Sequence, residues 1–418
     1  MTTIRTLGRN LLVIALPSLS LLPGKCQAQV PPTGSAIEAP AAQSTAPVKK
    51  PWYETFSIRG YGQIRYNRLL ETNPDLKCEQ CDRSWGDNGG LFIRRARIIF
   101  SGYVHPRVFI YLQPDFASNA GTTGHVVQLR DWYVDVGLDA ANEFRFRIGQ
   151  SKVPYGFENM QSSQNRLPLD RADATNSAHS NERDLGLFFY WAPKRIRDRF
   201  KMLVDEGLKG SGDYGVLAIG AFNGQTANRA EANDELHVVA RLTWPFEVKS
   251  QIIEPSVAFY TGNYVITSDQ RSSGLKGNDD WSYEDTRMLG GLCLYPRPFG
   301  LLAEYNVGRG PEYNPATDSV ETRDLSGGFA TATYRFKVKN HVILPFVRYQ
   351  VYEGGKKHEL DARSYTVNDV EFGIEWQPVK NFELVCEYYM ADRRFEDHAK
   401  PDNKQRGELL RIQAQFNF

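Results

Sequence analysis

Arginine recurs at every second position in several short stretches of the first third of the chain. In 92–101 and 143–150 the arginines alternate with apolar residues, which would place them on one face of a strand. A guanidinium group stays charged at physiological pH and donates two parallel hydrogen bonds to a phosphate or carboxylate. The seven arginines predicted to form one basic wall are Arg59, Arg65, Arg95, Arg97, Arg107, Arg145 and Arg147.

The polar positions of the later stretches carry carboxylates instead, with Arg348 and Arg411 as exceptions. If the strands close on themselves, the basic wall faces this acidic sector across one lumen. The resulting transverse field would orient polar solutes and favour one sign of ion. The alternative is that the arginines simply pair with neighbouring carboxylates across strands. The predicted acidic sector consists of Glu304, Glu371, Glu375, Glu383 and Glu387.

Strands must position these side chains, and the last residues have the clearest strand pattern. Even positions from Leu410 to Phe418 are apolar, and odd positions from Arg411 are polar. Such alternation is typical of a strand with one face toward lipid and one toward water. The terminal Phe resembles the signal read by the machinery that assembles outer-membrane barrels. We therefore predict that even positions in 92–100 and 410–418 face lipid.

Similar stretches recur from residue 53 onward, and about sixteen candidate strands can be counted, with an uncertainty of about two. The connections alternate between long and mostly short, except for 193–213, which is long and charged where a short turn is expected. We predict an all-β fold, a transmembrane antiparallel β-barrel of about 16 strands. A soluble sandwich or propeller also alternates, but it leaves the terminal Phe and the aromatic residues at strand ends unexplained. The predicted long loops are 68–91, 117–128, 151–182, 223–235, 263–284, 309–323, 353–364 and 392–405.

The amino terminus predicts export. Residues 1–28 combine two arginines, a short apolar run and small residues before a cleavage point, as a signal peptide does. Residues 29–52 are rich in Pro and Ala and are expected to form a flexible periplasmic extension, which leaves 53–418 for the barrel. After residue 28 no apolar run approaches the ~20 residues of a membrane helix. With a mean hydropathy of -0.46, a helical membrane protein is excluded.

Other motifs point to no catalytic or metal site. Cys78 and Cys81 form a Cys-Glu-Gln-Cys motif in a polar stretch, for which a small loop disulfide is favoured over free thiols or a metal or redox role. No zinc or calcium ligand spacing and no nucleophile elbow are visible. A glycine-rich match at 210–215 opens no helix, so it indicates turn glycines rather than a dinucleotide site. No catalytic residue, metal, cofactor or nucleic-acid partner is expected.

Three segments carry a family resemblance. They are Arg147-Ile148-Gly149-Gln150-Ser151-Lys152-Val153-Pro154-Tyr155-Gly156-Phe157-Glu158, Phe92-Ile93-Arg94-Arg95-Ala96-Arg97 and Glu182-Arg183-Asp184-Leu185-Gly186. Together they resemble the phosphate-selective porin O and P family over most of 53–418. The resemblance implies a sixteen-stranded, usually trimeric barrel whose third loop, here Pro154–Glu182, folds into the lumen.

In that family the anion preference is ascribed to basic residues at the constriction. The corresponding candidates here are Lys152, Arg166, Arg171 and Arg183. Asp170 and Asp173 lie among them, which departs from a purely basic constriction and weakens a phosphate-specific interpretation.

The functional hypothesis is a bacterial outer-membrane porin for passive diffusion of small hydrophilic solutes, with a preference for anions such as phosphate. Its expected partners are the lipid bilayer, small anionic or hydrophilic solutes, and two further copies in a homotrimer. A general or carbohydrate-type diffusion pore is the alternative within the class. An outer-membrane enzyme barrel is the alternative from a different class. Bilayer conductance separates a pore from an enzyme that only hydrolyses its substrate.

Overall fold

The computed structural model describes residues 51–73, 76, 90–119 and 125–418. These residues belong to the compact unit that runs from Lys50 to Phe418. The predicted signal peptide, nearly all of the predicted extension, and Cys78 and Cys81 lie outside the described residues. None of the helices in the described part is long and apolar enough to cross a membrane.

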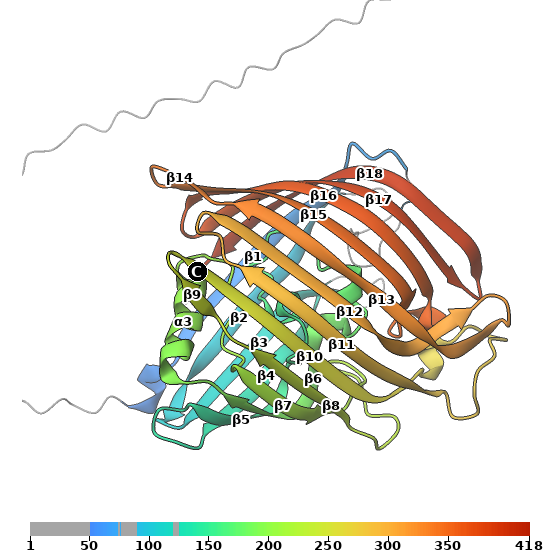
Figure 1. Cartoon of the computed structure of the whole chain (residues 1–418), viewed down its shortest axis with the longest axis horizontal. Coiled ribbons are helices and arrows are strands. Elements are labelled where there is room, and N and C mark those ends of the chain that lie inside the picture. Colours follow the sequence, from blue (N-terminus) through green and yellow to red (C-terminus); the bar gives the residue numbers. More distant parts are fainter. Residues whose placement is uncertain (1–50, 74–75, 77–89, 120–124) are drawn as a thin grey trace, which may run out of the picture. The chain divides into compact units, whose positions relative to one another are not determined.

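The chain is built from strands with a few short helices between them (Figure 1). The strands are β1 (Ser57–Leu69), β2 (Leu91–His105), β3 (Val108–Asn119), β4 (His125–Gly137), β5 (Phe144–Lys152), β6 (Arg183–Trp191), β7 (Leu217–Phe222), β8 (His237–Thr243), β9 (Phe246–Val248), β10 (Gln251–Val265), β11 (Ser282–Leu294), β12 (Phe299–Asn314), β13 (Ser319–Tyr334), β14 (Phe336–Val338), β15 (His341–Gly355), β16 (Ser364–Val379), β17 (Phe382–Asp397) and β18 (Lys400–Asn417). The helices are α1 (Phe157–Met160), α2 (Asp173–Asn176) and α3 (Lys194–Asp205), with 3-10 turns η1 (Trp52–Thr55), η2 (Ser180–Glu182), η3 (Ser268–Gln270) and η4 (Leu360–Ala362).

The sheet closes into a barrel because β1 pairs antiparallel with both β2 and β18. The short segment β9 continues the strand of β8, and the short segment β14 continues the strand of β13. Both β8 and β9 pair with β10, and both β13 and β14 pair with β15. The eighteen segments therefore form sixteen antiparallel strands, which confirms the predicted fold class and strand number.

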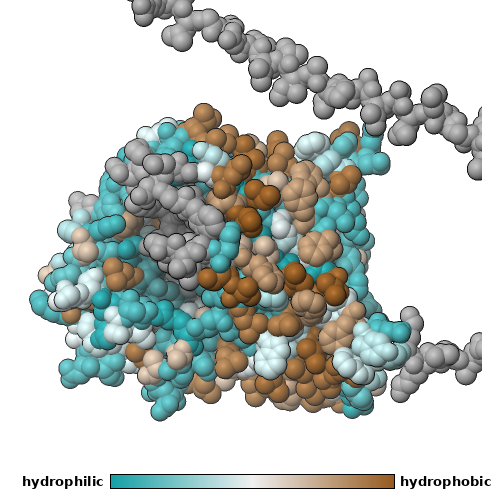
Figure 2. Space-filling view, turned by 180° about the vertical axis from the view of Figure 1, so that it is seen from behind, coloured by the Kyte–Doolittle hydropathy of each residue, from teal (hydrophilic) through white to brown (hydrophobic). Residues whose placement is uncertain are grey.

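The strand at the carboxy terminus alternates as predicted. In β18, Arg411, Gln413 and Gln415 are buried in the interior, while Ile412 and Phe416 lie on the outer surface. Outward apolar residues of many strands together form the apolar band in Figure 2, which hydrophilic residues border on both sides. Such a band is the lipid-facing surface of a membrane barrel.

In β2 the predicted alternation holds only after Arg94. Phe92 was expected to face lipid, but its side chain is 5% exposed, whereas that of Ile93 is 42% exposed. The cause is a β-bulge: Gln63 pairs with Arg95 and Ile64 with Ile93, which leaves Arg94 as an extra residue. One extra residue reverses the facing of every side chain on its amino-terminal side.

Two predictions about connections were wrong. The segments 309–323 and 392–405 were predicted to be long loops, but they are mostly strand, because β12 with β13 and β17 with β18 continue as polar hairpins. Beyond the apolar band both faces of a strand are polar, so the alternation that marks a strand disappears. The segment 193–213, which is long where a short turn is expected, contains helix α3. Its Ile196, Phe200 and Leu203 recur at helical spacing and are buried.

Candidate functional site

Residues 153–182, between β5 and β6, form a loop that we call loop 3. Its contacts with inward side chains of distant strands place it inside the barrel. Ser163 bonds the Tyr61 hydroxyl of β1 at 2.7 Å, and the Tyr155 hydroxyl donates to Asn306 of β12 at 2.5 Å. These contacts hold loop 3 against inward side chains of β1 and β12.

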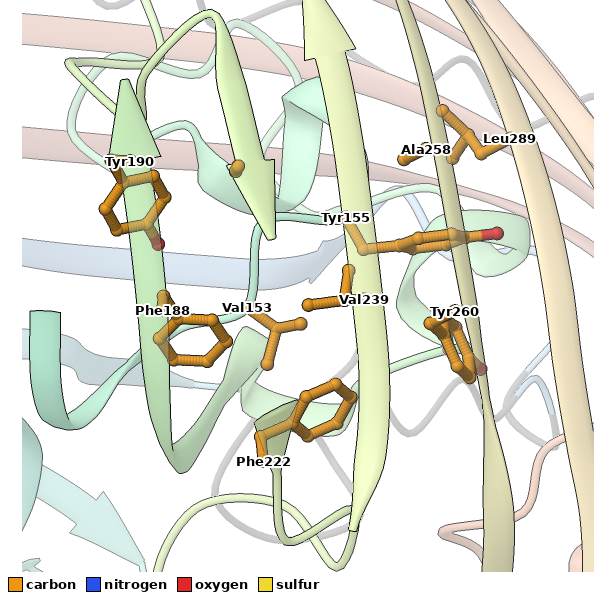
Figure 3. Packing of buried hydrophobic residues seen from close by; sticks show 11 residues of the cluster. Val153, Tyr155, Phe188, Tyr190, Phe222, Val239, Ala258, Tyr260 and Leu289 are labelled. Carbon is orange, nitrogen blue, oxygen red and sulfur yellow. The ribbon is translucent and has the colours of Figure 1, made fainter. Parts of the chain in front are cut away.

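An apolar cluster anchors the two ends of loop 3. Figure 3 shows Val153 and Tyr155 packed among aromatic and aliphatic side chains on the inner faces of β6, β7, β8, β10 and β11. The remaining labelled members are Phe188, Tyr190, Phe222, Val239, Ala258, Tyr260 and Leu289. In this part of the barrel both faces of the strands are apolar, because the inner face is covered by protein rather than by water.

Two of the five glutamates of the predicted acidic sector accept hydrogen bonds from backbone N–H groups of loop 3. Glu304 accepts hydrogen bonds from the backbone N–H groups of Phe157 and Glu158 at 2.5 and 2.9 Å. Glu387 accepts one from Leu169 at 2.8 Å. The other three pair elsewhere inside the barrel: Glu371 with Arg348 and Arg411, Glu375 with Lys209, and Glu383 with Asn417.

The acidic residues of loop 3 are held by arginines and a lysine. Asp170 lies 2.7 Å from Arg65, 3.1 Å from Arg411 and 3.3 Å from Arg94. Burial alone would raise the pKa of Asp170, but these guanidinium groups outweigh burial and hold the pKa well below its usual value. Asp170, one of the two aspartates that depart from a purely basic constriction, thus holds loop 3 to the barrel wall.

Asp173 is fastened in the same way. It contacts Lys356 and Arg393, and its backbone N–H donates to Gln350 of β15 at 2.9 Å. Burial alone would raise the pKa of Asp173, but the charges of Lys356 and Arg393 outweigh burial and lower the pKa to about 2. Asp173 is therefore charged at neutral pH.

A second segment enters the barrel from the end with the short turns. Residues 206–213, which we call the inner turn, follow α3. Gln161 of loop 3 donates to the carbonyl of Lys209 at 2.7 Å, and Lys209 itself bonds Glu375 at 2.5 Å. Leu208 and the buried face of α3 pack against Phe157 of loop 3 in one apolar cluster. Loop 3 and the inner turn thus support each other.

Two polar cavities bordered by the described residues lie on either side of loop 3. The loop-side cavity, toward the long loops, measures about 190 Å³ and is bounded by Arg94, Arg95, Arg97 and Arg130 together with loop 3. The turn-side cavity, toward the short turns, measures about 330 Å³. Its lining includes the predicted arginines Arg59, Arg107, Arg145 and Arg147 and the constriction candidates Lys152 and Arg183.

Two predicted residues are placed differently from the rest of the basic wall. Arg65 is fully buried against loop 3, where it bonds Asp170 and Gln413, and it borders neither cavity. Arg107 lies in the turn between β2 and β3, not on a strand face. The constriction candidates Arg166 and Arg171 border the loop-side cavity.

Most arginines of the wall have a carboxylate partner. Arg97 pairs with Asp115 at 2.7 Å, Arg147 holds Asp135 with two bonds of 2.7 and 2.8 Å, and Arg183 pairs with Asp131 at 2.9 Å. Arg145 and Arg171 pair with Asp213 and Glu182. The proposed pairing between neighbouring strands is therefore present for Arg97 and Arg147. Arg183 pairs with a residue of β4, two strands away, and the partners Asp213 and Glu182 lie outside the strands.

Three cations differ, because their partners are neutral. Arg95 donates to the amide oxygen of Gln63, Arg166 to the carbonyls of Pro168 and Leu169, and Lys152 to the carbonyls of Met160 and Gln161. In the part of the chain that the structure describes, no carboxylate oxygen lies within 4.0 Å of their side-chain nitrogens. Burial lowers the pKa of Arg166 to about 9, so it stays protonated at neutral pH.

Sequence reasoning missed Arg94 and Arg130. Both are extra residues at β-bulges, since Gln113 pairs with Asp131 and Pro114 with Leu129, which leaves Arg130 unmatched. The bulges turn both side chains inward, where Arg130 donates to Asn181 of loop 3 at 2.8 Å. A signal was present: strict alternation would have placed these arginines toward lipid, which is costly.

The geometry can be compared with known proteins. The family model described as phosphate-selective porin O and P matches residues 74–418. The outer membrane channel DcaP of Acinetobacter baumannii superposes with a TM-score of 0.53 at 14% identity, covering 87% of this chain and 97% of that one. OmpF of Salmonella typhi, solved in complex with daunomycin, has the same values. At 14% identity, the similarity to each of these two structures shows a common fold and nothing further.

The search of curated proteins found no match. Among the described residues, no group of three or more His, Cys, Asp or Glu side chains is placed to hold a metal ion. The family model, in contrast, spans most of the sequence, including loop 3 and every strand from β2 to β18. The chain belongs to the phosphate-selective porin O and P family.

Proposed function

We propose that this porin is an outer-membrane diffusion pore that prefers small anions, with phosphate-like oxyanions favoured. The observation that carries the proposal is a set of three buried cations that have no carboxylate partner among the described residues. Arg95, Arg166 and Lys152 are each 5% exposed, and each borders one of the two cavities. A buried charge without a counter-charge is costly, so an anion entering the constriction compensates it.

The wider charge balance supports the same preference. Seven basic side chains and three carboxylates line the loop-side cavity, and the turn-side cavity has the same numbers. A solute therefore meets a net positive lining on both sides of loop 3. Fields of one sign in a narrow channel raise the local concentration of the opposite ion, and several weak sites in sequence permit both entry and exit.

Location and assembly belong to the same proposal. The apolar outer band supports residence in a bilayer, and the family implies the bacterial outer membrane with the long loops outside. A homotrimer is what the family resemblance implies for assembly. Chemical cross-linking of the protein in outer membranes, followed by denaturing electrophoresis, tests the trimer: a ladder ending at three copies is expected.

A general diffusion pore remains the second candidate, and one observation favours it. The ion pairs of Arg97, Arg145 and Arg147 neutralise much of the basic wall. If these pairs dominate the field, small solutes of either sign pass equally well. The two candidates differ in one measurable quantity, the permeability ratio of anion to cation.

The test is the reversal potential of the purified protein in planar bilayers under a gradient of KCl. We expect anion selectivity for the wild type and a clear shift toward cations for Arg95→Gln combined with Arg166→Gln. The matched control is Arg309→Gln, which removes an exposed charge on the outer surface of β12. Equal permeability of both ions in the wild type, or no shift in the double variant, would contradict the proposal.

A further inference from the structure

The inner face of the β2–β3 hairpin is aromatic near its turn. Tyr103 and Phe109 face each other with ring centroids 5.0 Å apart. Tyr111 stacks on Tyr133 of β4 at 5.0 Å, with ring planes 10° apart. All four rings border the turn-side cavity. Polar side chains normally line the watered interior of a porin, so these rings break that rule where solutes pass.

The rings retain open surface. Tyr103 is 39% exposed, and Phe109 and Tyr111 are half-buried. Apolar surface left in contact with water raises the free energy of the barrel, and an apolar solute that covers these rings would remove that cost. Among the described residues that line the loop-side cavity, His358 is the one with an aromatic ring.

Two guanidinium groups with free donors border the same rings. Arg59 and Arg107 line the turn-side cavity, and no carboxylate of the described residues lies within 4.0 Å of either guanidinium. The guanidinium carbon of Arg59 lies 5.9 Å from the ring centroid of Tyr111. Arg145 also lines this cavity, and its buried Nη1 has no hydrogen-bond partner among the described residues. Cationic donors therefore surround an aromatic surface.

Helix α3 and the inner turn form part of the wall of the turn-side cavity. Arg197 and Val204 of α3 and Ser211 and Asp213 beside them complete its lining. Its volume of about 330 Å³ falls within the range of roughly 300–1,000 Å³ that small-molecule sites occupy. A solute can therefore pause here and not merely pass along an open wall.

We propose that the turn-side cavity binds small anions that carry an aromatic ring, of the aromatic-carboxylate class. The carboxylate accepts paired hydrogen bonds from Arg59 or Arg107, and the ring lies against Tyr103, Phe109 and Tyr111. An inorganic oxyanion uses only the cations, and a neutral aromatic molecule uses only the rings. The inference rests on the proposed function, because the solute reaches this cavity as an anion in the pore.

The experiment measures block of the small-ion current through the full-length protein in planar bilayers. The probes are benzoate, cyclohexanecarboxylate with the same charge but no flat ring, acetate with no ring, and benzyl alcohol with no charge. We expect the half-blocking concentration of benzoate to be about threefold or more below that of cyclohexanecarboxylate. Acetate and benzyl alcohol should not block in the same range.

Two variants assign the block to this cavity. Phe109→Leu keeps an apolar side chain but removes a ring, so the difference between benzoate and cyclohexanecarboxylate should shrink toward onefold. Arg59→Gln should raise the half-blocking concentration of both carboxylates by about fivefold. The matched control is Phe259→Leu, because Phe259 lies on the outer surface of β10 with 43% exposure. This control should block like the wild type.

The outcomes separate this site from the proposed selectivity. Equal block by benzoate and cyclohexanecarboxylate in the wild type would overturn the aromatic site, even if the reversal potential confirms anion preference. Unchanged benzoate block in a conducting Phe109→Leu variant would overturn it as well. Preferential benzoate block, abolished by Phe109→Leu, in a channel without anion preference would support the site and contradict the proposed function.

Discussion

Gly60 and Phe418 exchange two backbone hydrogen bonds, of 2.9 and 3.0 Å, across the seam where the first strand meets the last. A side chain at Gly60 would collide with this seam, since an added Cβ would lie 2.5 Å from the Phe418 ring and 2.3 Å from the carbonyl of Arg97. The terminal aromatic residue thus lies directly over a glycine. The seam accepts no side chain at position 60.

Gly60→Ala should therefore impair closure of the barrel. We expect a lower yield of folded protein, measured as the fraction that keeps its heat-sensitive mobility in electrophoresis. Gly62→Ala is the matched control, because an added Cβ at Gly62 meets nothing within 4 Å. Equal folding of the two variants would contradict the role of the seam.

Charge on the outer face should destabilise the barrel. Ile412→Arg places a guanidinium in the apolar band and is expected to cost about 2–4 kcal/mol of unfolding free energy near the midplane. Urea titration of the barrel in lipid vesicles measures the loss. Ile412→Met keeps the position apolar and should cost much less. A barrel that tolerates both equally would not have this face in lipid.

The fastening of loop 3 can be tested at Asp170. Asp170→Asn leaves the buried guanidinium of Arg65 without its carboxylate partner, and such a loss costs about 3–5 kcal/mol. We expect noisier single-channel currents and faster proteolysis within 153–182. Asp269→Asn removes an exposed carboxylate that pairs with Arg229 at the surface, and its currents should match the wild type. Quiet currents in Asp170→Asn would mean that other contacts hold the loop.

The inner turn should limit conductance. Phe200→Ala removes a buried aromatic ring from the inner face of α3, which is expected to cost about 3–5 kcal/mol of unfolding free energy. The loss of packing should let the inner turn move out of the lumen. We expect a larger single-channel conductance. Lys201→Ala changes the next residue, which is exposed, and serves as the control. An unchanged conductance in a folded Phe200→Ala variant would show that the inner turn does not restrict the path.

Acid should release loop 3, and the pKa of Asp173 sets the window. Because the folded-state pKa is lowered to about 2 from a usual value of about 3.9, its contribution to stability is complete above pH ~4. The contribution is lost as the pH falls through 2. Conductance should thus be constant from pH 7 to 4 and become noisy below. Asp173→Asn should show that noise already at pH 7. Noise in the wild type that begins near pH 6 would point to other groups.

The sequence predicted the strands best where one face meets lipid and the other meets water or polar protein. The alternation of Ile412 and Gln413 is of this kind, and it was confirmed. The search for strand alternation did not find α3, whose Ile196, Phe200 and Leu203 recur at helical spacing instead. Alternation also could not predict the bulges at Arg94 and Arg130, which shift the register by one residue. Pairing in register depends on the neighbouring strand, and periodicity within one strand does not contain that information.

The candidate site was predictable in residue type but not in partnership. Arg95 and Arg147 occupy similar positions in their strands, yet only Arg147 has a carboxylate partner. That difference depends on Asp135 across the strand pair and on a loop that folds back from residue 153. Likewise, Glu304 was predicted to face the lumen as part of the acidic sector, whereas it accepts hydrogen bonds from backbone N–H groups of loop 3. Long-range contacts of this kind leave no local pattern.

The position of the cavities along the chain has a consequence for engineering. All described residues that line the turn-side cavity come from 59–214, and among the described residues the loop-side cavity adds Lys356, His358 and Glu359. Apart from these three residues, the linings of both cavities come from one contiguous stretch of the sequence. The second half of the chain completes the barrel and holds loop 3 in place. A chimera that exchanges 59–214 with a relative should transfer permeability as a cassette, provided that Glu304, Glu371 and Glu387 are kept to receive the incoming loop.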